Sequence, residues 1–166
     1  MNSPNQLSLF DLIQDCYQIG CHYLNIIPYK QVVFKGFYSE KLFTEISNNK
    51  QIAQSLRLNL NDLHQKQEFA ELLQRVPKEF AGITWALTNE SWITLNPTYC
   101  QPLLQGDLSY LLCHEITHAV LHNLDIYWGH SSPHSELTAY LWQYCQKKYS
   151  HQQLVKLLIS WWEMNQ

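Results

Sequence analysis

The spacing of apolar positions changes character along the first third of the chain. From residue 7 to about residue 24, apolar side chains recur at three- and four-residue intervals. This spacing predicts an amphipathic helix, which ends before Pro28. Residues 31–34 are rich in β-branched and aromatic side chains and lie between Pro28 and Gly36. They therefore predict a short strand or an extended arm.

The next segment has a mostly helical pattern, from residue 39 to residue 75. Asparagines at residues 48–49 and 59–61 predict two breaks in it. The last helix of this segment is expected to begin after a cap at residues 61–62, and to end at Pro77.

The period then switches from helical to alternating. Residues 82–87 and 91–95 are strand-like, and residues 88–90 between them predict the loop of a hairpin.

Helical spacing returns after the hairpin. Asp107 is a candidate N-cap for a helix over residues 108–122, and Asn123 is a candidate C-cap. Two further helices are predicted over residues 135–147 and 152–162.

This order of elements predicts an α+β fold in one domain, residues 1–166. Residues 1–78 form a mostly helical N-terminal part, and residues 79–166 hold the hairpin and the later helices. The composition agrees, since 46% of the residues are hydrophobic and only 15% are charged. That balance is typical of a chain with a large buried core.

Charge and cysteine content narrow the function classes. The formal net charge is −3 and the pI is about 6.2, so no basic surface for nucleic acid is expected. No apolar run approaches the length of a membrane span and no leader peptide is recognisable at the start, so we expect no membrane partner. Five cysteines without a CxxC pair fit a reducing compartment, and we expect a cytoplasmic protein.

The sequence His114-Glu115-Ile116-Thr117-His118 carries the chemistry. Histidines four residues apart on a helix lie on one face, where two imidazoles can bind one zinc ion. Glu115 would then lie beside the metal and act as the general base for a zinc-bound water. HExxH on a helix is a metalloprotease signature with these roles.

A catalytic zinc usually takes a third protein ligand. The candidates are His122, His130, His134 and Glu136. His122 lies a further turn along the same helix, and successive turns diverge by about 5.4 Å, so it is the weakest of them. The other three follow a loop that can return the chain to the helix.

Residues 114–122, HEITHAVLH, and residues 135–145, SELTAYLWQYC, resemble the ImmA/IrrE-like zinc metallopeptidases, which are of the minigluzincin type. The resemblance covers about residues 80–148 and implies a zincin-like core. It also implies that Glu136 is the third ligand. A helix would hold Glu136 more rigidly than a loop holds a histidine. Tyr140, one turn later, is a candidate catalytic residue that would stabilise an oxyanion.

A second resemblance keeps other ligands open. The SprT-like peptidases have HExxH followed by a loop that ends in a third histidine, and Gly129-His130 and Pro133-His134 are similar to that pattern. In this interpretation His134 or His130 is the ligand.

The sequence therefore predicts a hydrolase, namely a zinc-dependent peptidase that cleaves a protein or peptide substrate. The alternative is a catalytically weak or inactive zinc-binding module that regulates a partner protein.

Overall fold

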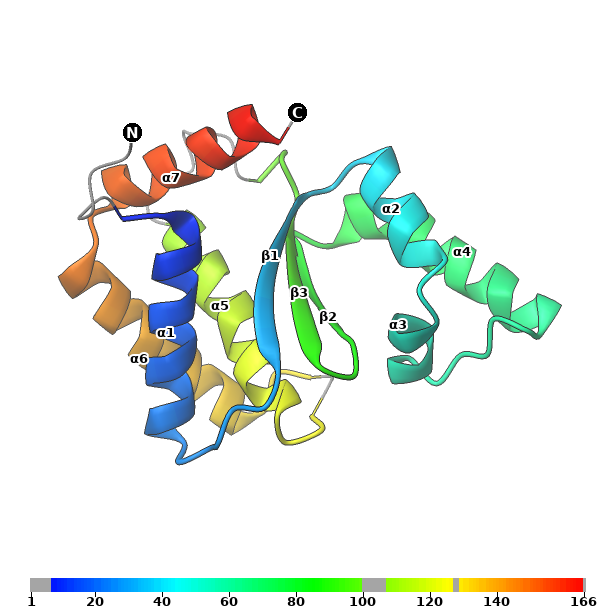
Figure 1. Ribbon diagram of the computed structural model, residues 1–166, viewed down its shortest axis with the longest axis horizontal. Helices are drawn as coiled ribbons and strands as arrows, with labels where there is room; N and C mark the ends of the chain where they lie inside the picture. The colour runs from blue at the N-terminus through cyan, green and yellow to red at the C-terminus, as the bar shows by residue number, and fades with distance from the viewer. Residues whose placement is uncertain (1–6, 100–106, 127–128, 166) are drawn as a thin grey trace.

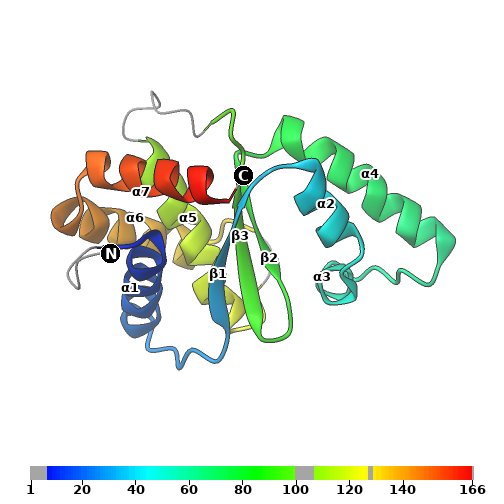
Figure 2. The ribbon, with the colours of Figure 1, turned by 45° about the horizontal axis from the view of Figure 1, so that its top comes forward.

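A three-stranded sheet separates two layers of helices (Figure 1). The computed structural model describes residues 7–99, 107–126 and 129–165. Figures 1 and 2 both show α1, α5, α6 and α7 on one side of the sheet and α2, α3 and α4 on the other. The predicted α+β class is confirmed.

The sheet has the order β1-β3-β2. Its central strand β3 (Glu90–Leu95) pairs parallel with β1 (Gln31–Phe37) and antiparallel with β2 (Gly82–Ala86). The predicted hairpin is confirmed as β2 and β3, and the segment predicted as a short strand or an extended arm is strand β1. Because β3 lies between its two partners, β2 forms an edge of the sheet.

The first helical layer contains the HExxH segment. It consists of α1 (Leu9–Tyr23), α5 (Asp107–His122), α6 (Ser132–Lys148) and α7 (His151–Met164). Alternate residues of β3 enter the core of this layer, because successive side chains of a strand point to opposite faces. The core includes Ile93, Leu95, Ile116, Val120 and Leu141.

The second layer covers the other face of the sheet with α2 (Glu40–Ser47), α3 (Lys50–Ser55) and α4 (Leu63–Glu79). Trp85 of β2 and Trp92 of β3 are cross-strand neighbours that pack against Phe69 and Val76 of α4. The N-terminal part of the chain is thus divided between both layers and supplies one strand.

Local capping sets the helix ends, with one departure from expectation. Asp62 caps α4, since its carboxylate accepts the Gln65 N–H at 3.0 Å. The prediction that Pro77 ends this helix is wrong, because α4 continues to Glu79. At this end of the helix Asn96 donates its side-chain amide to the carbonyls of Pro77 and Phe80, at 2.9 and 3.2 Å, and so satisfies two acceptors that the helix leaves open.

Asn123 follows the last residue of α5, and its side chain holds that end of the helix in place. Its side-chain oxygen accepts the backbone N–H groups of Tyr29 and Lys30, both at 3.1 Å. Its amide donates to the Tyr17 hydroxyl at 2.8 Å. The helix that carries HExxH is therefore tied to α1 and to the segment before β1.

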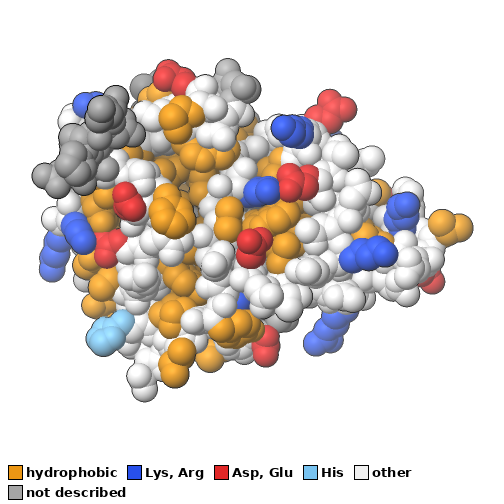
Figure 3. All heavy atoms as spheres, viewed as in Figure 1, with side chains coloured by type: hydrophobic (Ala, Val, Ile, Leu, Met, Phe, Trp, Pro, Cys, Tyr) orange, Lys and Arg blue, Asp and Glu red, His pale blue; other side chains and the backbone are white. Residues whose placement is uncertain are grey.

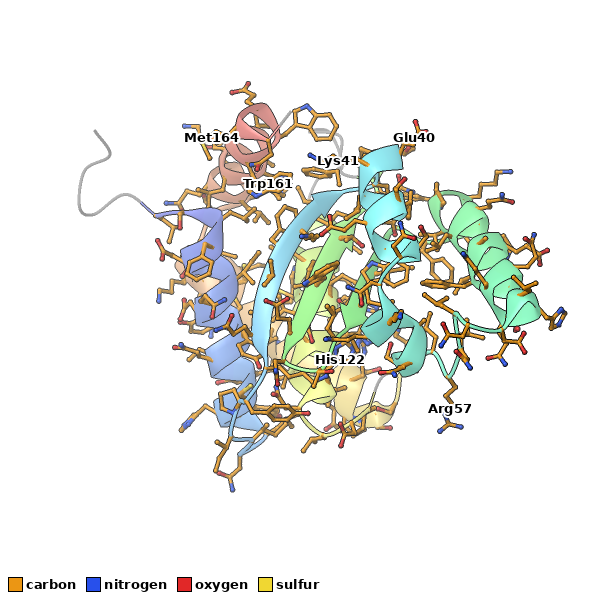
Figure 4. All side chains as sticks on the ribbon, turned by 45° about the vertical axis from the view of Figure 1, so that its right-hand side comes forward. Glu40, Lys41, Arg57, His122, Trp161 and Met164 are labelled. Atoms are coloured by element: carbon orange, nitrogen blue, oxygen red, sulfur yellow. The ribbon has the colours of Figure 1, made fainter. Side chains whose placement is uncertain are left out.

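The C-terminal helix is locked against β1 by close packing. Trp161 projects from α7 toward β1 (Figure 4). A Cβ at Gly36, whose φ is +120°, would lie 2.3 Å from the Trp161 ring. Glycine is required here both by the backbone and by the indole.

The face in Figure 3 carries cationic and acidic side chains scattered among each other. No continuous basic stripe is visible among the described residues of this face, so it offers no argument for a polyanionic ligand. Within the described ranges, none of the helices combines the length and apolar character needed to cross a bilayer.

Candidate metal centre

The outward face of α5 presents His114 and His118 one turn apart. Their ring centroids are 4.9 Å apart. The opposite face of the helix, with Ile116, Ala119 and Val120, is completely buried in the core. Burial of that face fixes the rotation of α5 and so aims both imidazoles away from the core.

Two further histidines complete a cluster. His134 lies in the first turn of α6 and His130 in the loop between α5 and α6. The ligand atoms of the four histidines all lie within 4.8 Å of one another, so they could hold a metal ion. His134 is centred 4.5 Å from His114 and 4.2 Å from His118.

Packing between α5 and α6 brings His134 to this position. Thr138, one turn after His134, donates a buried hydrogen bond to Thr117 at 3.1 Å. Ser131 caps α6 and accepts the His134 N–H. The cap and the helix contact therefore hold the third imidazole over the first two.

The spacing fits a single ion. Nitrogens at zinc–nitrogen distances of 2.0–2.1 Å in a tetrahedral site are about 3.4 Å apart. The Nε2 atoms of His130 and His114 are 3.1 Å apart. The widest pair in the cluster is within 4.8 Å, so the four atoms could hold one ion after side-chain rotation.

The electrostatics favour neutral imidazoles. Burial, followed by the neighbouring histidines, lowers the pKa of His114 to about 4 and that of His118 to about 2. Burial and His130 lower the pKa of His134 to about 4. Neutral imidazoles have the free lone pair that a metal requires.

His134 has a buried ring nitrogen that an ion could satisfy. Its Nε2 is buried and has no hydrogen-bond partner among the described residues. The backbone of His114 acts on the same ring in the opposite sense to burial and raises its pKa. A buried imidazole nitrogen without a partner, in a cluster of four histidines, is an atom that a metal ion could satisfy.

Glu115 lies beside the cluster with its carboxylate enclosed. The residue is 2% exposed, and the Thr84 hydroxyl on β2 lies 3.0 Å from its Oε1. Burial raises the pKa of Glu115 to about 8, and the hydrogen bond from Thr84 partly offsets that rise. A cation held by the histidines would supply the charge that favours the ionised form.

A cavity of about 300 Å³ opens beside these groups. His114, His118, His130, Glu115 and Thr84 line one part of it. Its size is at the lower end of the range for ligand pockets, about 300–1,000 Å³. The histidine cluster and the buried carboxylate thus share a space that a ligand can enter.

Glu136, the preferred third ligand, is not among the clustered residues. It is exposed, whereas His134 is 2% exposed. Residues two apart on a helix point about 200° apart, so only one of this pair can face α5. The inward positions are taken by His134, Leu137, Thr138 and Leu141. The alternatives His134 and His130 are the residues that the fold brings to the pair on α5.

Tyr140 also lies away from the site. It is 39% exposed and stacks on Tyr23 of α1, with ring centroids 4.2 Å apart. It does not line the cavity described above. Its position four residues after Glu136 places it on the same outward face of α6.

His122 is separate from the cluster, as its place on α5 predicts. It is 1% exposed, and its Nδ1 lies 2.7 Å from the Ser91 hydroxyl. Figure 4 places it at the end of the sheet next to the C-terminus of α5. It belongs to the core rather than to the candidate metal centre.

Two parts of the site escaped the sequence interpretation. The contact of Thr84 with Glu115 joins residues 31 positions apart. The wall that α4 gives the cavity, with Leu72 and Val76, comes from a helix that no sequence motif connects with the site. The alternation in residues 82–87 does indicate that Thr84 faces away from Ile83 and Trp85. It does not indicate which residue the Thr84 side chain contacts.

Comparison with known proteins gives no identity. A scan against family models, a search of curated proteins and a search of solved structures each found no match.

Proposed function

We propose that this chain is a metal-dependent peptidase in which His114, His118 and His134 hold a zinc ion. The observation that carries the proposal is the convergence of four histidine ligand atoms within 4.8 Å beside the enclosed carboxylate of Glu115. Nitrogen donors of this kind suit zinc, and two of them belong to HExxH.

Glu115 is the general base in this proposal. When bound, the ion supplies the charge that polarises a peptide carbonyl and acidifies water. Glu115 accepts the proton of the attacking water and then donates it to the departing amine. Thr84 holds the carboxylate in place through its hydroxyl.

The edge strand β2 gives the substrate a place to bind. On either side of β2, the Leu87 N–H bonds the Glu90 carbonyl and the Asn96 N–H bonds the Ala81 carbonyl. Bonded and outward-facing residues alternate in an antiparallel pair, so Gly82, Thr84 and Ala86 direct backbone groups to the free edge. An extended peptide can add to this edge next to the histidines.

The proposed set of zinc ligands favours one of the two family resemblances over the other. A third histidine after a loop is similar to the SprT-like arrangement, and an outward-facing Glu136 argues against the ImmA/IrrE-like one. We therefore favour SprT-like peptidases as the comparison for this site.

A second candidate function follows from His130. Four imidazoles would close a tetrahedral zinc site and leave no place for water, as in structural sites. A closed site would make the chain a zinc-stabilised module that acts by binding a partner. We favour the peptidase because His130 is exposed on a loop, whereas the other three histidines are wholly or partly buried.

The test compares wild type with Glu115→Gln. We expect about one zinc per chain in both proteins by elemental analysis. Cleavage of an unfolded protein substrate should fall by roughly 10²–10⁴-fold in the variant, since the general base is lost. A zinc-loaded variant that cleaves as fast as wild type would exclude this role for Glu115.

A further inference from the structure

Helix α4 meets the edge strand beside the histidine cluster. Leu72 and Val76 of α4 and Phe80 after it line the cavity from one side, and Ile83 of β2 continues the same wall. The α2–α4 layer therefore extends as far as the candidate active site.

The lining is chemically divided. Leu72, Val76, Phe80 and Ile83 give an apolar surface at the α4 side, and Leu111 of α5 adds one more apolar side chain to the lining. The histidines, Glu115 and Thr84 gather at the α5 side. An apolar surface next to a small set of convergent polar groups is typical of a site that binds one part of a ligand and reacts with another.

The apolar part is open to solvent. Among its lining residues Val76 is completely buried, while Phe80 is 40% exposed. A volume of about 300 Å³ holds one large side chain and a short length of backbone, rather than a folded domain.

Strand geometry connects the apolar part to a peptide on β2. The side chains of Ile83 and Trp85 face the α4 layer, whereas Thr84 faces α5. Side chains of an added strand alternate in the same way, so every second one is directed toward α4. A peptide at the edge would thus offer one side chain to the apolar surface and its neighbour to the histidine side.

We propose that Leu72, Val76, Phe80, Ile83 and Leu111 form a specificity pocket for one large apolar side chain of the substrate. The substrate class is accordingly an extended peptide with a leucine-, methionine- or phenylalanine-like residue close to the bond that is cut. This inference rests on the proposed function, because the peptide binds at the proposed metal site. It gives the α2–α4 layer the role of selecting the substrate.

Cleavage profiling tests the preference. Zinc-loaded protein is incubated with a library of peptides from a denatured proteome, and the residues around each cut are counted. We expect one position to be enriched in large apolar residues and depleted in charged ones. An even distribution at every position would overturn the pocket.

A filling substitution tests which residues form it. Leu72→Trp should reduce kcat/KM for a Leu-containing peptide by roughly 10-fold or more, and leave the Ala-containing peptide nearly unchanged. Leu63→Trp is the matched control, because Leu63 begins the same helix and is 84% exposed. Equal losses for both peptides in Leu72→Trp, with zinc content and thermal unfolding unchanged, would contradict the proposal.

Binding separates this inference from the proposed function. Fluorescence polarisation with zinc-loaded Glu115→Gln measures the affinity of labelled hexapeptides that contain Leu, Ala or Lys at one position. A Leu preference that Leu72→Trp abolishes supports the pocket even when wild type cuts nothing, an outcome that would sink the peptidase proposal alone. Cleavage by wild type without any Leu preference in binding would sink the pocket alone.

Discussion

The Thr84 hydroxyl on the edge strand lies 3.0 Å from the Glu115 carboxylate and 2.9 Å from the Glu115 backbone carbonyl. One side chain of β2 thus contacts both the backbone of the HExxH helix and its acidic group. The strand proposed to bind substrate and the residue proposed to move its proton are held together by this contact.

Thr84→Val keeps the shape of the side chain and removes the hydroxyl. We expect kcat to fall roughly 10-fold, about 1.4 kcal/mol, because the carboxylate loses the partner that orients it. Zinc content should not change. Thr88→Val, at an exposed position after the same strand, is the control. Unaltered kcat in Thr84→Val would show that the contact has no part in turnover.

Substitutions on the two faces of α6 test which residue is the third zinc ligand. His134→Ala should weaken zinc binding by more than roughly 100-fold, beyond the losses typical of groups that only orient a ligand. Glu136→Ala should retain zinc, because Glu136 is exposed and outside the cluster. Competition with a fluorescent chelator measures both. The reverse result would restore Glu136 as the ligand.

The sequence predicts local features of this fold well. The spacing of His114 and His118 is enough to place both on one face of a helix, because α-helical geometry is local. Asp62 and the asparagine-rich breaks likewise mark helix ends through contacts within a few residues. Pro77 misleads because a proline removes only its own N–H, so α4 still continues to Glu79, and the Pro77 carbonyl is satisfied by Asn96, which is distant in sequence.

The third ligand depends on how α6 is rotated against α5. A local signal was present, since Leu137, Leu141 and Cys145 define an apolar stripe whose extension by three residues reaches His134 and not Glu136. The position of His130 has no such signal, because it is set by the course of a loop. The α4 wall of the cavity is still less predictable, because it requires a contact between segments on opposite faces of one sheet.

His130→Ala distinguishes an open metal site from a closed one. We expect zinc to be retained by His114, His118 and His134, and cleavage to be at least as fast as in wild type, since a position near the ion is freed. Chelator competition and a cleavage assay check the two parts. Loss of zinc from this variant, together with an inactive wild type, would favour the closed binding module.

Asp15 of α1 is hydrogen-bonded to residues at the end of α6, and we expect these contacts to make the free energy of unfolding depend on pH. Its carboxylate accepts hydrogen bonds from Lys148 at 2.8 Å and from Tyr144 at 3.0 Å, and Tyr149 donates to it as well. Burial alone would raise the pKa of Asp15, but the bonds from Lys148, Tyr149 and Tyr144 outweigh it and lower that pKa below 3.8.

A lowered folded-state pKa stabilises the protein above the unfolded value, and that contribution is lost as the pH falls through the folded value. Asp15→Asn should therefore reduce the free energy of unfolding by about 1 kcal/mol at pH 7, a modest figure because the site is partly exposed. The difference from wild type should shrink steadily below about pH 4. Urea unfolding at several pH values measures it, and Glu68→Gln, at an exposed position of α4, serves as a control. A constant difference between pH 7 and pH 3 would mean that Asp15 stabilises the fold through packing and not through its charge.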